Sequence, residues 1–284
     1  MSFRTSNKLQ RYENVKISLN DVIELPGNNN SQKKTGYKFT INDRSTLFDF
    51  YNGYFEFAME LQKKADSTGY ARADRITVIN GAHSLIKPMV IKSSGKIVYE
   101  SDNIHRITNV KNLLEYSDDF SRSVAKNSFW YLDTNAETAN TNTGFEARRT
   151  LTQAAANDGT GDAKSINGTI PLNRYSFFEE LENKMLPPMQ LQIELTLNDD
   201  DELIHKAAAA AEGRVVVTRL YLWLPKMVPK DSLYSAFVSD FLKPSKWVYM
   251  RELYNQSPNT KAVQNMFQIN PAIDNVKHVF VSLQ

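Results

Sequence analysis

The stretch "LQIELTL", Leu191–Leu197, has the strictest alternation of apolar and polar residues in the chain. Its apolar positions are all Leu or Ile, and the residues between them are Gln, Glu and Thr. Successive side chains of a β-strand point to opposite faces of a sheet, so this period of two predicts a strand with one buried and one solvated face. The stretch therefore indicates a sheet that lies on an apolar core.

Strand-like stretches of related pattern lie on both sides of it. They are "GYKFTIN" (Gly36–Asn42), "YFEFAMELQ" (Tyr54–Gln62), "ADRITVIN" (Ala73–Asn80), the hairpin "SLIKPMVIKSSGKIVYES" (Ser84–Ser101) and "RVVVTRLYLWLPKM" (Arg214–Met227). The last is apolar on both faces, which is typical of a central or covered strand. With about eight or nine strands over residues 37–224 and helices only in the connections, the pattern predicts a mainly-β, jelly-roll-like β-sandwich.

One helix is well marked after the hairpin. Asp102 or Asn103 can cap its start, and apolar residues follow at helical spacing. Its apolar face consists of Ile104, Ile107, Val110, Leu113 and Leu114. Shorter helices are predicted in "FFEELENKM" (Phe177–Met185), "DDDELIHKAAAAAEG" (Asp199–Gly213) and "DSLYSAFVSDFLKP" (Asp231–Pro244).

Composition divides the chain into three parts. Residues 1–35 are predicted to be a polar N-terminal arm, and residues 36–243 the β-sandwich domain. Within that domain, residues 134–168 are rich in Asn, Thr, Gly and Ala, which predicts either disorder or a long exposed insertion that packs on something else. Residues 244–284 begin a new run of strand-like segments.

Charge and composition narrow the functional classes. The 284 residues carry a formal net charge of +2 and include no cysteine. The charge gives no basic field that would argue for specific nucleic-acid readout, and disulfide frameworks and thiolate chemistry are excluded. We expect no transmembrane helix and no secretory signal, because no apolar run is long enough and the N-terminus is polar.

Candidate catalytic and metal residues are sparse. None of the four histidines, His83, His105, His205 and His278, stands at metal-ligand spacing from another. The acidic run Asn198–Glu202 could bind calcium, but it also suits a loop that leads into a helix N-terminus. No phosphate loop, nucleophile elbow or HExxH motif occurs. We therefore predict no catalytic, cofactor-binding or metal residues, and a protein that is not an enzyme.

Two further groups of residues allow alternative interpretations. Lys87, Lys92 and Lys96 could bind phosphate, or they could protect a strand edge from unwanted pairing. The tryptophans could line a sugar site, or they could be large buried core residues. They are Trp130, Trp223 and Trp247.

Several blocks resemble the double jelly-roll major capsid proteins of Polinton/Maverick elements, adintoviruses and related small eukaryotic DNA viruses. The blocks are Asn80–Ser117, Ser128–Thr134, Ile170–Ile204, Val215–Pro229 and Glu252–Gln284. The likeness is a pattern of hydrophobic blocks over most of residues 37–284, with no catalytic motif to anchor it. Family members are usually longer and have two complete jelly rolls, so the resemblance implies that residues 244–284 begin a second jelly roll that is truncated or completed by another chain.

The resemblance implies a structural role. Such proteins form trimers of pseudo-hexagonal outline that tile an icosahedral shell, and they contact copies of themselves and minor capsid or penton proteins. It implies a location in the virion capsid after synthesis in the host cytoplasm or nucleus. Residues 134–168 would be a tower or inter-subunit loop, and residues 1–35 an inner arm.

Two other functions fit the residues. A non-catalytic β-sandwich module that binds carbohydrate or a partner protein would use the tryptophans and the exposed loops. An enzyme on a jelly-roll scaffold would need a metal such as iron, zinc or manganese.

Overall fold

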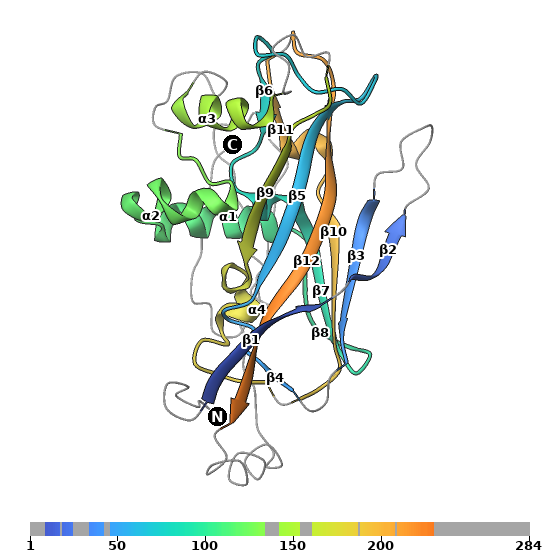
Figure 1. The fold of residues 1–284 in the computed structure, drawn as a ribbon, viewed down its shortest axis with the longest axis vertical. Helices are drawn as coiled ribbons and strands as arrows, with labels where there is room; N and C mark the ends of the chain where they lie inside the picture. Colours follow the sequence, from blue (N-terminus) through green and yellow to red (C-terminus); the bar gives the residue numbers. More distant parts are fainter. Residues whose placement is uncertain are drawn as a thin grey trace, which may run out of the picture. The chain divides into compact units, whose positions relative to one another are not determined.

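The computed structural model describes residues 9–17, 19–24, 34–42, 46–133, 142–153, 161–186, 188–207 and 209–229 (Figure 1). The predicted helix Asp231–Pro244 and the predicted strand-like segments of 244–284 lie outside these residues.

Strands dominate this part of the chain. They are β1 (Leu9–Ile17), β2 (Leu19–Glu24), β3 (Lys34–Ile41), β4 (Leu47–Phe48), β5 (Tyr54–Lys63), β6 (Ile76–Val78), β7 (Ile86–Ser93), β8 (Lys96–Ser101), β9 (Ser165–Pro171), β10 (Leu191–Leu197), β11 (Ile204–Lys206) and β12 (Gly213–Pro229). The α-helices are α1 (Ile104–Glu115), α2 (Asp118–Arg122), α3 (Thr143–Thr152), α4 (Ser176–Glu179) and α5 (Asp200–Leu203), and the 3-10 helices are η1 (Ala82–Leu85), η2 (Val124–Ser128) and η3 (Leu172–Arg174).

The two large sheets have the strand connectivity of one long antiparallel hairpin that has been rolled up. One sheet has the order β1-β12-β5-β9, with β4 added beside β12, and the other has the order β2-β3-β10-β7-β8. In chain order, the outermost strands β1 and β12 pair, then β3 with β10, then β5 with β9, and finally β7 with β8, all antiparallel. Rolling this long hairpin brings β5 beside β12 and β7 beside β10. This connectivity is the jelly roll, and it confirms the predicted fold class.

The core lies between the two sheets. β10 alternates buried and half-buried residues as its sequence predicts, and Ile193 is fully buried. Phe39 on β3 and Phe55 on β5 belong to different sheets, yet their ring centroids are 5.6 Å apart, so the inner faces interdigitate. This burial of large apolar side chains is the main stabilising contribution to the sandwich.

The N-terminal part differs from the expected polar arm. Residues Leu9–Ile17 and Leu19–Glu24 form β1 and β2, which extend one sheet each by pairing with β12 and β3. Charged residues interrupt the apolar alternation here, so the strands carry little local signal and depend on backbone pairing to a neighbour.

The predicted insertion 134–168 contains ordered structure in its described residues. Asn142 caps α3 by accepting a hydrogen bond from the backbone N–H of Phe145, and β9 begins at Ser165. Phe145 and Arg148 are fully buried on one side of α3. This helix is therefore partly buried, and its buried face carries one aromatic and one arginine rather than an apolar stripe.

The helix predicted over Asp199–Gly213 is shorter than expected. Among the described residues of this range, only Asp200–Leu203 is helical, and Ile204–Lys206 continues as β11, paired with β6. The β-branched Ile204 and the pairing with β6 favour the extended conformation over the alanine-rich helix. In the described part of the chain, no helix is long and apolar enough to cross a lipid bilayer.

Candidate interaction surface

Helix α1 is turned so that polar side chains face the core. Its buried residues are Ile104, His105, Thr108 and Asn112. Leu113 and Leu114 are 59% and 66% exposed. An apolar helix face ordinarily packs on the core, so the position of these two leucines needs a cause.

Hydrogen bonds at Asn112 supply that cause. Arg174 Nε donates to Asn112 Oδ1 at 2.8 Å, and Asn112 Nδ2 lies 3.2 Å from His83 Nδ1. Since the amide oxygen already accepts from Arg174, the amide nitrogen donates and His83 Nδ1 accepts. Arg174 also donates to Glu115 at 2.7 Å, so this one side chain of η3 binds two side chains at the end of α1.

His83 is neutral in this network. Burial lowers its pKa to about 3, and Arg174 and His105 act in the same direction. Gly81 has φ +82° just before η1, and a Cβ there would lie 2.2 Å from the His83 ring, so only glycine allows the turn that brings this ring beside Asn112.

Contacts between Glu202 and basic side chains fix the start of α1. Glu202 on α5 lies 3.0 Å from His105 Nε2, 3.3 Å from Arg106 and 3.3 Å from Lys87 on β7. These basic groups lower the pKa of Glu202, and Lys87 pairs with Asp199 as well, at 3.2 Å. The acidic run Asn198–Glu202 thus joins α5 to β7 and α1.

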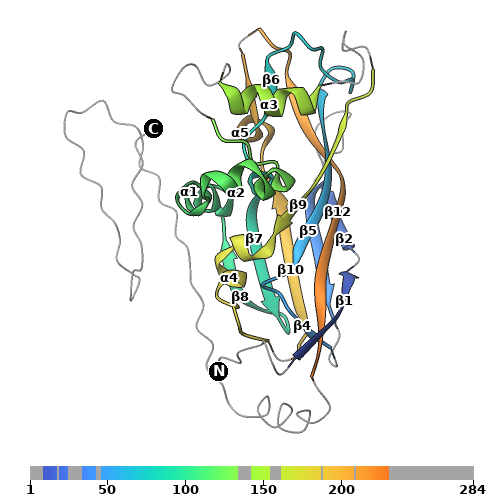
Figure 2. The same ribbon diagram turned by 60° about the vertical axis from the view of Figure 1, so that its left-hand side comes forward.

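Fixed in this way, α1 and its neighbours present an exposed apolar ridge. The apolar ridge consists of Leu113 and Leu114 on α1, Phe120 on α2 and Val124 on η2. Phe120 is 37% and Val124 57% exposed, and the Phe120 ring packs against Tyr116 at 4.7 Å. In both ribbon views α1, α2 and α3 lie on the same side of the two sheets (Figure 2). Exposed apolar residues gathered in this way mark interaction surfaces.

A basic groove of about 210 Å³ begins on the same 3-10 helix, η2. It is lined by Lys126, Phe129, Tyr131, Leu151, Lys164, Ser165, Ile166 and Asn167. Phe129 has φ 55°, a left-handed conformation that is uncommon for an aromatic residue and that tends to occur at functional sites. Among the residues that the structure describes, neither Lys126 nor Lys164 has an ion-pair partner.

The other candidate residues do not form a common site. His205 pairs with Thr77 in the β11–β6 ladder, and His278 lies outside the described residues. Lys92 binds Glu194 at 2.7 Å on the outer face of its sheet, and Lys96 is exposed at the β7–β8 turn. The described residues include no group of three or more His, Asp or Glu side chains that could hold a metal ion.

The tryptophans are separated in the fold. Trp130 is buried, with its ring 5.7 Å from the ring of His83. Trp223 is half-buried, stacks on Tyr54 at 6.5 Å and donates to Glu56 at 2.8 Å. Trp247 lies outside the described residues.

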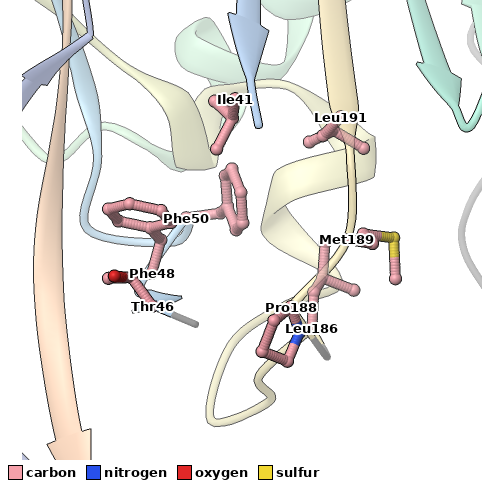
Figure 3. A pocket seen from close by; sticks show the side chains of 8 residues that line it. All are labelled: Ile41, Thr46, Phe48, Phe50, Leu186, Pro188, Met189 and Leu191. Carbon is pink, nitrogen blue, oxygen red and sulfur yellow. The ribbon is translucent and has the colours of Figure 1, made fainter. Parts of the chain in front are cut away.

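An apolar pocket at the end of β10 is too small for a ligand. Figure 3 shows its lining side chains, among them Phe48, Phe50, Met189 and Leu191. Its volume of about 10 Å³ is at the lower limit for a single water molecule.

Comparisons with solved structures found proteins of similar fold. The chain is structurally similar to viral major capsid proteins. It matches the mavirus major capsid protein with a TM-score of 0.43 and 11% identity over 81% of this chain and 48% of the other. For the Faustovirus major capsid protein the TM-score is 0.46, with 9% identity over 81% of this chain and 56% of the other. For a protein of the Sputnik virophage the TM-score is 0.45, with 12% identity over 80% of this chain and 52% of the other.

This chain spans about half the length of these capsid proteins. No protein-family model and no curated protein sequence matches it.

Proposed function

We propose that the chain is a structural subunit of a viral or virus-derived capsid. The observation that carries the proposal is the position of the resembling sequence blocks in the fold. The block Asn80–Ser117 forms the β7–β8 hairpin and α1, Ile170–Ile204 includes α4 and β10, and Val215–Pro229 forms most of β12. Blocks that resemble those of jelly-roll capsid proteins thus occupy strands of a jelly roll.

The mechanism is burial of complementary surface between copies, with no bond chemistry. The apolar ridge supports this function, because exposed apolar side chains on α1, α2 and η2 are typical of a surface that a partner covers. Subunits would associate as pseudo-hexagonal trimers, the trimers would form an icosahedral shell, and minor capsid or penton proteins would be further partners. The location is the virion capsid.

Light scattering coupled to size-exclusion chromatography, followed by negative-stain microscopy, tests the proposal. We expect trimers or larger particles at high protein concentration. A strict monomer over the whole accessible concentration range would contradict a capsid role for this chain.

A further inference from the structure

We propose that the apolar ridge and the basic groove form one self-complementary contact, in which a second copy of this chain inserts its α2 segment into the groove. This proposal rests on the proposed function, because it names a contact by which copies associate. The occupant follows from charge and shape on the two sides.

The ridge carries acids beside its aromatic residue. Asp118 and Asp119 precede Phe120 directly, and all three lie on α2. Asp118 is 82% exposed, and its pairing with Arg122 at 3.8 Å is between two solvated side chains. Such exposed pairs contribute little, so the carboxylate is available to a better partner.

The groove offers the opposite chemistry. Its apolar side chains are Phe129, Tyr131, Leu151 and Ile166, and Lys126 and Lys164 supply positive charge. A ligand that suits it has an apolar or aromatic side chain flanked by carboxylates. Asp118–Asp119–Phe120 presents this combination on the surface of the same protein.

The position of both features on one helix allows a two-fold contact. Val124 of the ridge and Lys126 of the groove both belong to η2. A surface that carries a ridge and its complementary groove side by side can pair with a copy of itself about a two-fold axis, each ridge in the partner's groove. In the proposed contact the arrangement is isologous, so each charge pair forms twice.

A charge-reversal cycle tests the contact in the full chain. One variant carries Asp118→Lys and Asp119→Lys, and the other carries Lys126→Glu and Lys164→Glu. In either variant alone, like charges face each other twice, and we expect the association constant to fall on the order of 100-fold. An equimolar mixture restores both pairs in a heterodimer, so association returns to within about 10-fold of the original chain.

Controls are Glu100→Lys and Lys96→Glu, each of which reverses one charge at an exposed position on β8. We expect them to associate as the original chain does. Sedimentation velocity measures association, and far-ultraviolet circular dichroism shows that each variant is folded.

The outcomes separate the two proposals. If the original chain assembles and both reversal variants assemble equally well, or if the β8 controls lose as much, the ridge–groove contact is wrong while the capsid role stands. If the variants dissociate but their mixture does not recover, the two charge groups do not meet and the contact is also wrong. If the original chain never associates, both proposals fall.

Discussion

Strand β10 buries its apolar residues, whereas helix α1 exposes two of its leucines. In β10 the residues that alternate as Leu, Ile, Leu, Leu are buried, and the Gln, Glu and Thr residues between them are half-buried. In α1 the polar Thr108 and Asn112 are buried, while Leu113 and Leu114 face outward. Hydrophobic pattern determines burial in the strand, whereas hydrogen bonds to His83 and Arg174 determine it in the helix.

The strongest way to test this contrast is to remove apolar volume from β10. Ile193→Ala deletes a fully buried side chain between the sheets and leaves a cavity. We expect the free energy of unfolding to fall by about 2–5 kcal/mol, measured by urea denaturation. Gln192→Ala, on the solvated face of the same strand, is the control and should change it by about 0.5 kcal/mol or less. Equal effects at both positions would contradict the assignment of faces.

Removing the amide of Asn112 tests the polar side of the comparison. Asn112→Ala leaves Arg174 Nε and His83 Nδ1 without this partner in a buried place. We expect a loss of about 1–3 kcal/mol in the free energy of unfolding, because buried polar groups left unpaired retain their desolvation cost. Leu113→Ala, one residue further on, should leave stability almost unchanged. A smaller loss for Asn112→Ala than for Leu113→Ala would refute the polar anchoring of α1.

The pH dependence of unfolding tests whether His83 is buried and neutral in the folded protein. The folded-state pKa of His83, about 3, is below its unfolded value, so below about pH 6.5 the unfolded state binds more protons. The stability contribution is complete above pH 6.5 and declines as pH falls towards 3, by about 1 kcal/mol at pH 5.5.

A His83→Gln variant should show a flatter decline of stability between pH 6.5 and pH 5. His105 and His205, whose pKa values are also lowered by burial, would account for the remaining slope. An unchanged slope in the variant would show that His83 is not neutral and buried in the folded protein.

The smallest effect on stability is expected at the ridge itself. Leu114→Ser replaces a side chain that is 66% exposed, so the free energy of unfolding should change by about 0.5 kcal/mol or less. Self-association should weaken nevertheless, because the leucine would be covered in the assembly. Loss of stability in the monomer would mean that the leucine packs on its own chain.

The sequence predicted the features whose cause is local. The alternation in β5 and β10 and the hairpin within Ser84–Ser101 each follow from neighbouring residues, and the structure confirms these elements. The rotation of α1 could not be predicted in this way, since it depends on His83 from η1 and Arg174 from η3. Helix α3 was missed because Arg148, a residue that is rarely buried, occupies its inner face.

The interaction surface could be predicted from the sequence only in part. Leu113 and Leu114 were recognised as members of an apolar face, but their exposure needs the tertiary hydrogen bonds of Asn112. Lys126 and Lys164 come from η2 and the loop before β9, and only the approach of β9 to η2 brings them to one groove. The sequence signal that could have drawn attention to α2 is Phe120 directly after two aspartates.

The rolled hairpin also has a consequence for how the chain folds during synthesis. β1 pairs with β12, and the register joins Leu9 to Pro229. Contacts between residues so distant in sequence form slowly. A chain that emerges from the ribosome N-terminus first cannot form this strand pair until β12 has been synthesised. Until then β5 has an unpaired edge on the side that β12 will occupy, and at high local concentrations of nascent chains that edge is exposed to pairing with the wrong molecule.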